Sequence, residues 1–291
     1  MTTAAALRVG SVLRETVARF RQAGIATAQQ DAELLLARML GTSRLALHLG
    51  VRGEVPAAAR ADFEALVARR AEQEPIQYIL GETDFCGLGL AVGPGVFIPR
   101  PETELLVERA LAACPRGAGL VLEPCTGSGA VACALAARWP GVSVWATDFS
   151  PVAVGWARAN VRRLGLTERV TVLEGDLFAP VAGAGLAGRC DLVVANPPYI
   201  EHSALASLPD EVRRWEPAHA LNGGADGLSV IGRILVEAAG FLRAGGTLLL
   251  EIGHDQAERL RGRLAADPPY ERPVMHRDFA GRERVLEVRR A

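Results

Sequence analysis

Hydrophobic positions follow a helical period in the first quarter of the chain. Between residues 7 and 20, apolar side chains recur at the three- and four-residue intervals that are typical of an amphipathic helix. A second apolar set follows Asp31, which is a candidate helix start, and stops at Gly41. Residues 57–71 carry a third set. We therefore expect a small helical bundle over residues 4–73.

From residue 100 onward, short apolar runs alternate with helical stretches. The apolar runs are mostly continuous rather than alternating with polar residues, which indicates strands that are buried on both faces of a parallel sheet covered by helices. Two late segments, 273–276 and 285–288, could close this sheet as an antiparallel pair. The expected strands are 119–122, 142–146, 170–173, 191–195 and 247–251, and the expected helices lie near 101–113, 130–139, 151–164 and 227–243.

The stretch between these two regions has a different composition. Residues 75–99 contain frequent glycine and proline between short apolar pieces, which favours a hairpin connector. The chain of 291 residues is long enough for two domains. We expect a helical domain over residues 1–74, a hairpin linker over 75–99 and an α/β domain over 100–291.

Composition narrows the chemistry that is available. The 49% hydrophobic content supports a sizeable core, and the net charge of −1 does not favour a nucleic-acid binder. Every one of the 32 basic residues is arginine. The absence of lysine excludes a Schiff-base lysine and a phosphate-loop lysine.

Cysteine and histidine give no sign of a metal site. The five cysteines are odd in number and lack ligand spacing, and the five histidines are scattered, so a reducing compartment and no metal are expected. The start, Met1 to Ala4, lacks the pattern of a signal peptide, and no apolar run approaches the roughly 18 residues of a membrane span. We expect a soluble, cytoplasmic protein without membrane association; the oligomeric state stays open.

A glycine-rich turn follows the first expected strand of the α/β domain. Such a turn, opening a helix, lets the backbone approach a ligand and directs free N–H groups toward it. Cys125 stands where dinucleotide enzymes usually have their first glycine, which weakens a nicotinamide interpretation. A reactive cysteine is disfavoured because no histidine is near it in sequence. The candidate cofactor residues of the turn are Glu123, Cys125, Thr126, Gly127, Ser128 and Gly129.

Acidic residues follow the next two expected strands. Asp148 lies about twenty residues after the glycines, where a carboxylate binds ribose hydroxyls; alternatively it caps the helix that starts near Pro151. Asp176 could accept a hydrogen bond from an adenine amino group between apolar neighbours. Glu123 would face either the amino-acid end of a cofactor or the turn itself.

The sequence Asn196-Pro197-Pro198-Tyr199 comes directly after the strand 191–195. The Asn196 side-chain oxygen and the Pro197 carbonyl could accept both hydrogens of one planar NH2 group, and Tyr199 offers it a flat face. An amide nitrogen is a poor nucleophile, so catalysis would come from positioning and preset dipoles. The alternative is a simple strand-to-loop break. Together with the turn, this motif favours methyl transfer from S-adenosylmethionine to an amide or amine nitrogen.

These motifs resemble those of class I S-adenosylmethionine methyltransferases that act on planar NH2 groups. Adenine-N6 DNA methyltransferases and protein glutamine methyltransferases of the HemK/PrmC type share the Asn-Pro-Pro-Tyr motif. Further stretches resemble the second group from about residue 30 to the C-terminus. They are residues 74–81, 97–104, Glu216-Pro217, Leu221, Gly223-Gly224, 226–228 and 280–282.

The resemblance implies a Rossmann-like methyltransferase domain with an N-terminal helical partner-recognition domain. It implies that Asn196, Pro197, Pro198 and Tyr199 hold the glutamine of the Gly-Gly-Gln loop of peptide chain release factors, with Asn196 and Pro197 catalytic. It further implies that S-adenosylmethionine contacts the turn, Asp148 and Leu177; Asp176 and Asn196 are further candidate cofactor residues. Many members carry tryptophan where this chain has Leu177, which leaves less area for stacking on adenine.

Three functional classes remain open. The release-factor type is favoured over the related ribosomal-protein glutamine methyltransferases because the latter usually depart from Arg100-Pro101-Glu102-Thr103-Glu104. An adenine methyltransferase would need a basic surface for the nucleic-acid backbone. A non-catalytic binding protein would not need the whole motif. Phe97, Arg100 and Glu102 could line the substrate entrance, or Phe97 could be core and Arg100 could pair with a surface acid.

Overall fold

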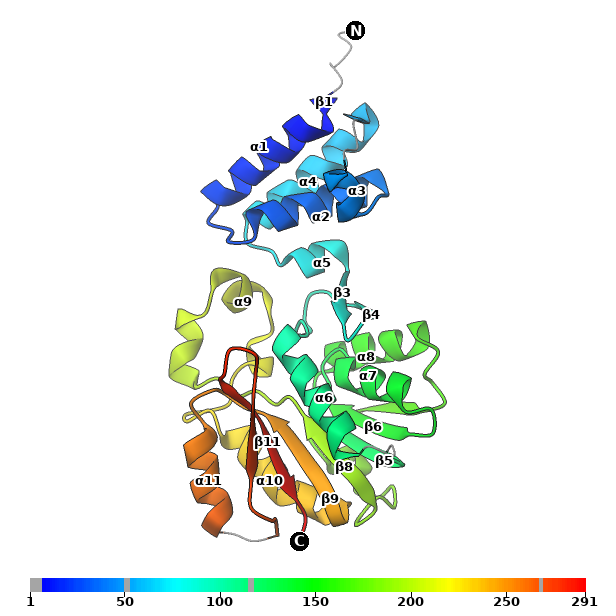
Figure 1. The fold of residues 1–291 in the computed structure, drawn as a ribbon, viewed down its shortest axis with the longest axis vertical. Helices are drawn as coiled ribbons and strands as arrows, with labels where there is room; N and C mark the ends of the chain where they lie inside the picture. The colour runs from blue at the N-terminus through cyan, green and yellow to red at the C-terminus, as the bar shows by residue number, and fades with distance from the viewer. Residues whose placement is uncertain (1–6, 50–52, 115–117, 267–268) are drawn as a thin grey trace. The chain divides into compact units, whose positions relative to one another are not determined.

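The computed structural model of the protein describes residues 7–49, 53–114, 118–266 and 269–291 (Figure 1). The chain divides into two compact units. Unit 1 consists of Met1–Gly81 and Pro209–Trp215, and unit 2 consists of Glu82–Leu208 and Glu216–Ala291. Residues 1–6 lie outside the described residues. They include residue 4, the expected start of the helical stretch, and Met1 to Ala4, where no signal-peptide pattern was expected.

Unit 1 is a bundle of helices around one apolar core. Three of its helices match the three predicted ones: α1 (Val9–Gln22), α2 (Ala28–Leu40) and α4 (Arg60–Ala71). The short helices α3 (Arg44–His48) and α5 (Ile76–Leu80), and the two-residue pair β1 (Leu7–Arg8) and β2 (Glu54–Val55), were not anticipated. The core residues include Val12, Phe20, Ala32, Leu35, Leu36, Phe63 and Val67.

Helix α2 begins earlier than predicted because Asp31 has another role. The helix starts at Ala28, with Thr27 before it, and Asp31 lies inside its first turn. The Asp31 carboxylate accepts hydrogen bonds at 2.8 Å from both the Thr27 hydroxyl and Arg70 Nε. Asp31 therefore links α2 to α4 rather than capping a helix.

Arg70 is the centre of a buried polar cluster within unit 1. Its guanidinium also donates to the Glu74 carbonyl at 3.0 Å and to Glu211 Oε2 at 2.9 Å. Glu211 belongs to α9 (Asp210–Trp215), the segment that joins unit 1 although it lies far along the chain. The side chains of Arg70 and Asp31 are only 3% and 2% exposed. Loss of Arg70 would therefore leave the Asp31 carboxylate buried without its cationic partner.

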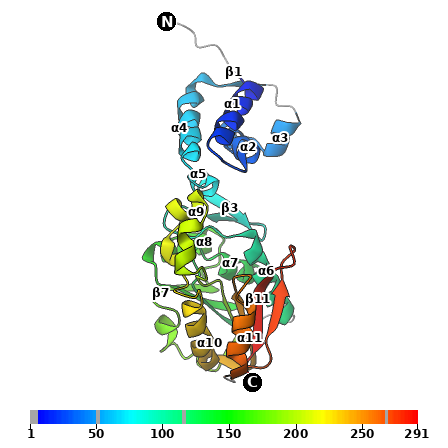
Figure 2. The ribbon, with the colours of Figure 1, turned by 90° about the vertical axis from the view of Figure 1, so that its left-hand side faces the viewer.

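Unit 2 is built on a seven-stranded sheet (Figures 1 and 2). The strand order is β10-β11-β9-β8-β5-β6-β7, and all neighbours from β9 to β7 are parallel. The late strands β10 and β11 form an antiparallel pair at one edge of the sheet, as predicted, and β11 pairs antiparallel with β9. The strands are β5 (Leu120–Pro124), β6 (Ser143–Asp148), β7 (Val170–Glu174), β8 (Cys190–Ala195), β9 (Leu242–Glu251), β10 (Val274–Arg277) and β11 (Glu283–Arg289).

Helices cover both faces of this sheet. Helices α6 (Glu104–Ala113), α7 (Ala130–Arg138) and α8 (Pro151–Arg163) pack on one face, and α10 (Ser229–Phe241) and α11 (Ala257–Ala266) on the other. Successive strand residues alternate between the two cores; Leu192 and Val194 face the first, and Val193 and Ala195 face the second. This double burial is why the strands appear in the sequence as continuous apolar runs.

The glycine-rich stretch before the α/β region contains the predicted hairpin. Strands β3 (Glu82–Phe85) and β4 (Leu88–Ala91) pair antiparallel in unit 2, while the preceding residues 76–80 form α5 of unit 1. Within the described residues, none of the helices combines the length and the apolar character needed to span a bilayer.

We predict that Arg70→Ala lowers the stability of unit 1 by about 3–5 kcal/mol, because Asp31 would remain buried without its partner. Native-state hydrogen exchange of the α2 and α4 amides measures this loss. Arg19→Ala is the matched control, since Arg19 pairs with Glu64 at 3.2 Å on the surface and such pairs contribute about 0–1 kcal/mol. Equal effects of the two substitutions would contradict the prediction.

Candidate functional site

The predicted site residues converge on the carboxyl edge of the parallel sheet. Strand β5 has β6 on one side and β8 on the other, so the chain reverses its direction of winding there. Ligands of open α/β sheets bind at such a switch point, beyond the carboxyl ends of the strands. The turn follows β5, Asp148 ends β6, and Asn196 follows β8.

The glycine-rich turn is held from three directions. Gly127 N donates to Asp148 Oδ2 at 2.9 Å, and Thr126 N donates to the Thr147 carbonyl at 3.0 Å. The Ser128 carbonyl accepts from the Asn160 side chain at 2.9 Å, and Asn160 also pairs with the backbone of Ala91 in β4. No sequence pattern indicated this role of Asn160, which lies inside α8.

The two glycines of the turn have different steric surroundings. Both have positive φ, +56° at Gly127 and +78° at Gly129. A Cβ at Gly129 would come within 3.2–3.3 Å of Ala157 in α8. The absence of a side chain at Gly129 therefore permits α8 to pack closely against the turn. A Cβ at Gly127 would meet no atom within 4 Å. The open space above Gly127 leaves room for a ligand against the turn.

Cys125 adopts a conformation that glycine usually supplies. Its φ is +60°, in the left-handed region that L-residues rarely occupy, which explains why related turns have glycine there. Burial raises the pKa of its thiol, and nearby Asp148 and Glu123 raise it further. A thiol held protonated is a poor nucleophile, in agreement with the rejection of a reactive cysteine.

Glu123 faces the turn rather than solvent. It is 2% exposed, and its Oε2 accepts from the Thr126 hydroxyl at 2.9 Å. Burial raises the pKa of Glu123 to about 8, although the hydrogen bonds from Thr126 and the Ala132 backbone lower it in part. Glu123 is therefore mainly protonated at neutral pH.

Asp148 does not cap α8. The N-cap is Ser150, whose hydroxyl accepts from Ala153 N at 3.3 Å. The Asp148 carboxylate instead accepts from Ser150 N and Gly127 N, and these bonds lower its pKa against the larger raising effect of burial. A carboxylate has about four acceptor positions, so two remain for hydroxyl groups of a ligand.

Asp176 and Leu177, which were expected to contact adenine, make contacts with other parts of the protein. The Asp176 carboxylate forms two bonds to Arg233 of α10, at 3.1 and 2.6 Å. Leu177 has φ +45° and is 5% exposed. Its carbonyl accepts from the Thr147 hydroxyl at 2.6 Å. The side chain of Leu177 thus contributes mainly to the core beneath α10, and little of it is available for stacking.

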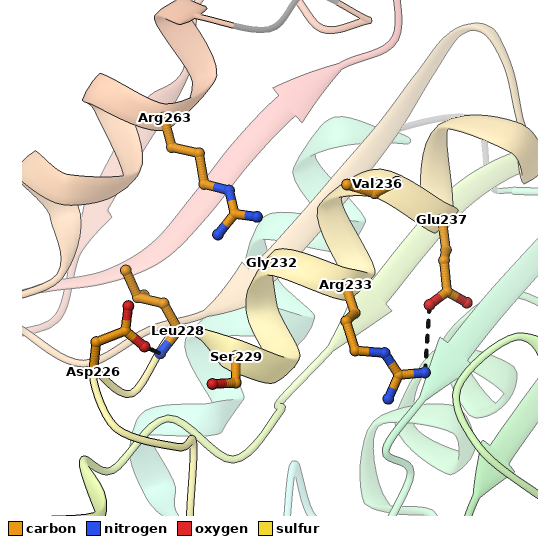
Figure 3. Close-up of a pocket in the computed structure, with 8 residues that line it drawn as sticks. All are labelled: Asp226, Leu228, Ser229, Gly232, Arg233, Val236, Glu237 and Arg263. Carbon is orange, nitrogen blue, oxygen red and sulfur yellow. Dashed lines mark hydrogen bonds and ion pairs between the residues drawn. The ribbon is translucent and has the colours of Figure 1, made fainter.

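Arg233 also lines a hollow of about 460 Å³ on the outer side of α10 (Figure 3). Figure 3 shows Arg263 of α11 reaching over Gly232 and Asp226 at the opposite rim. None of the predicted site residues lines this hollow. The described parts of the chain contain no cluster of three or more histidine, cysteine or acidic side chains able to hold a metal ion.

The Asn-Pro-Pro-Tyr segment is anchored by residues that the sequence did not single out. Asn196 Nδ2 donates to the Thr103 hydroxyl at 3.1 Å, and the Tyr199 hydroxyl donates to Glu251 Oε1 at 3.2 Å. The Tyr199 carbonyl accepts from Gln256 at 2.9 Å. Pro197 is buried. Thr103 lies within the quoted Arg-Pro-Glu-Thr-Glu stretch, and Glu251 ends a predicted strand, so position alone could have drawn attention to both.

Arg100 pairs with a buried acid, not a surface one. Its guanidinium bonds to Glu216, whose other oxygen accepts from Ile98 N at 3.2 Å. Phe97 is half-buried, with the Arg100 guanidinium 4.9 Å above its ring. The ion pair brings together two stretches, 97–104 and 216–217, that the sequence matched to the same family.

Comparison with known proteins agrees with this geometry. Family models match the chain over residues 11–81 (PrmC N-terminal domain) and 94–209 (methyltransferase small domain). A release factor glutamine methyltransferase of Moorella thermoacetica is 41% identical, covering 94% of this chain and 95% of that protein. One of Mycolicibacterium smegmatis is 42% identical, covering 97% and 98%.

Solved structures show the same fold. The catalytic domain of hMettl16, in complex with the MAT2A 3'UTR hairpin 6, has a TM-score of 0.58 at 17% identity, covering 78% of this chain and 81% of that one. This likeness confirms the predicted class I methyltransferase fold and carries no information on the substrate.

We predict that Asp148→Ala raises the dissociation constant for S-adenosylmethionine about 10- to 100-fold. Hydrogen bonds to a charged group contribute about 1.5–3 kcal/mol, and the variant would lose them. Calorimetry measures the dissociation constant. Asp191→Ala is the matched control: Asp191 Oδ2 likewise accepts from two backbone N–H groups, of Gly119 and Leu120, but at the start of β8. Unchanged affinity in Asp148→Ala would exclude a ribose contact.

We predict that Glu123 makes stability fall as pH rises. Its pKa is about 8 in the folded protein against an ordinary value of 4.5, so between these values the folded state binds more protons than the unfolded state. Stability should decrease across that window by up to about 1.4 kcal/mol per pH unit. Glu123→Gln should lose this part of the slope in urea unfolding at several pH values; an unchanged slope would refute the assignment.

Proposed function

The chain belongs to the release factor glutamine methyltransferase family, and we propose that it transfers a methyl group from S-adenosylmethionine to the side-chain amide nitrogen of the glutamine in the Gly-Gly-Gln loop of peptide chain release factors. The single observation that carries this proposal is the Asn-Pro-Pro-Tyr segment at the switch point, beside a turn with open space above it. Identity of about 40% over nearly the whole chain supports the choice of substrate.

The cofactor residues fit a nucleoside with a charged amino-acid tail. The backbone of residues 125–129, with three positive φ values, presents the turn and the start of α7 toward the ligand. Asp148 keeps acceptor positions for ribose hydroxyls, and Asp176 would lie at the adenine end, where the buried Leu177 side chain offers little area for stacking. When bound, S-adenosylmethionine supplies an electrophilic methyl group on a positively charged sulfur.

The substrate residues act by position. Asn196 Oδ1 and the Pro197 carbonyl would accept the two hydrogens of the glutamine NH2 group, which fixes the plane of the amide. They also stabilise the positive charge that develops on the nitrogen as its bond to carbon forms. Tyr199 would pack against the flat group. As the methyl–sulfur bond breaks, S-adenosylhomocysteine would be the leaving group; the nitrogen would then lose one proton to water, and the product would be a neutral N-methyl amide.

Unit 1 is proposed to recognise the release factor. It matches the PrmC N-terminal domain model over residues 11–81 and has its own core. The methyltransferase fold is shared with proteins of low identity, so the fold by itself does not select a release factor, and unit 1 is our candidate for that selection.

Intact-mass spectrometry tests the function directly. Purified release factors are incubated with the protein and S-adenosylmethionine, and each is expected to gain the mass of one methyl group at the Gly-Gly-Gln glutamine, located by peptide fragmentation. A release factor with that glutamine replaced is the control. Methylation of duplex DNA or of a ribosomal protein instead would overturn the proposal.

We predict that Asn196→Ala lowers turnover at least about 100-fold, as does removal of one preorganised transition-state contact. The affinity for S-adenosylmethionine should change only modestly, because the turn and Asp148 remain intact. Tritium transfer and calorimetry measure the two quantities. Near-normal turnover by a folded variant would refute the assigned role.

A further inference from the structure

Thr103 and Glu251 lie beside the Asn-Pro-Pro-Tyr segment for reasons of topology. Strands β8 and β9 are parallel neighbours in which Ala195 pairs with Leu250, so Asn196 and Glu251 are the next residues on each strand path. Thr103 ends the short 3-10 turn Pro101–Thr103 that leads into α6. Both residues are buried, at 3% for Thr103 and 2% for Glu251.

The Glu251 carboxylate needs hydrogen-bond donors. Its Oε1 accepts from the Tyr199 hydroxyl at 3.2 Å, whereas Oε2 is buried without a partner of its own among the described residues. The Thr103 hydroxyl is a second donor that acts on this carboxylate and lowers its pKa. Since an ionised carboxylate can only accept, this interaction requires the Thr103 hydrogen to point toward Glu251.

This direction determines how the Asn196 amide is oriented. A hydroxyl has one hydrogen, so a Thr103 hydroxyl that donates to Glu251 can only accept from Asn196. The nitrogen of the Asn196 carboxamide must therefore face Thr103, as the 3.1 Å contact from Nδ2 has it. Its oxygen is thereby turned away from Thr103. A flipped amide would set two acceptors against each other.

We propose that Thr103 and Glu251 are positioning residues that fix the orientation of the Asn196 carboxamide, so that its oxygen and not its nitrogen meets the substrate NH2 group. Glu251 also anchors the far end of the same loop through the Tyr199 hydroxyl. The inference rests on the proposed function for its catalytic consequence, but the orientation itself is a property of the ligand-free protein. It assigns a role to the threonine of the Arg-Pro-Glu-Thr-Glu stretch.

Thr103 and Glu251 should fix the orientation of the Asn196 carboxamide only while Glu251 is ionised. Burial raises the pKa of Glu251 to about 6; the hydrogen bonds from Thr103 and Tyr199 and the charge of Arg284 lower it, and Glu102 raises it. A protonated Glu251 can itself donate, which releases the Thr103 hydroxyl from its fixed direction. Turnover at saturating cofactor should therefore decline as the pH falls below about 6.

Two substitutions of Thr103 separate the hydroxyl from its packing. Thr103→Val keeps the shape and removes the hydroxyl, and we expect kcat to fall about 10- to 100-fold, the scale of a misplaced reacting group. S-adenosylmethionine affinity should stay within about twofold. Thr103→Ser should restore most of kcat. A Thr103→Val enzyme with normal kcat, or a Thr103→Ser enzyme as impaired as Thr103→Val, would overturn the proposal.

Glu251→Gln tests the other partner and also serves if Thr103→Val does not fold. Its side-chain amide can donate or accept, so it no longer imposes a direction on the Thr103 hydroxyl. We expect a reduced kcat without the decline below about pH 6. An unchanged acid limb in Glu251→Gln would overturn the role of this carboxylate.

Hydrogen exchange of the Asn196 side-chain amide gives a readout that does not depend on activity. Its NMR signals are assigned by their absence in Asn196→Asp. Exchange is expected to be slow in the unmodified protein, at least about tenfold faster in Thr103→Val, and slow again in Thr103→Ser. Equal rates in the first two would refute the orientation. A protein that shows the expected exchange but methylates no release factor would refute the proposed function alone.

Discussion

The parallel pairing of β5 with both β6 and β8 is the constraint on which the site depends. Parallel strands place all their carboxyl ends at one edge, and the reversal at β5 is the place where ligands of such sheets bind. Residues about 70 positions apart, such as Cys125 and Asn196, thereby follow adjacent strands. A sheet buried on both faces cannot shift its register without exposing its core, so the strand ends provide a rigid base for residues that must act by position.

Much of this arrangement could be predicted because the strands are buried on both faces. Five continuous apolar runs located five strands, and the residues after them located the turn, Asp148 and Asn196. Helix α5 and the start of α2 were missed, because the sequence shows neither that Asp31 binds Arg70 nor that residues 76–80 form a helix. Such errors arise where a long-range contact overrides a local signal.

The contacts made by the predicted polar residues could not be predicted either, because they also depend on long-range contacts. Asp148 could be placed at the end of β6, but its bond to Gly127 depends on how two loops fold over neighbouring strands. Thr103 and Glu251 are ordinary residues in sequence. Their importance comes from a network that joins three segments, 101–103, 196–199 and β9, and a single sequence carries no pattern for such a network. Cys125 shows the converse case: its departure from glycine was visible, but its φ of +60° was not.

Two buried acids of the site, Glu123 and Glu251, differ in charge at neutral pH because their surroundings differ. Glu123 has two compensating donors, the Thr126 hydroxyl and the Ala132 backbone, and nearby Asp148 raises its pKa further; it is held neutral near pH 7, where it braces the turn through Thr126. Glu251 also has two donors, the hydroxyls of Thr103 and Tyr199, but the charge of Arg284 favours its ionised form, and its pKa of about 6 leaves it mostly ionised. A neutral Glu123 can hold the turn without placing a second negative charge beside Asp148. An ionised Glu251, which can only accept hydrogen bonds, is the form that sets the direction of the Thr103 hydroxyl. The same residue type therefore serves two purposes because its burial is compensated to different extents at the two positions.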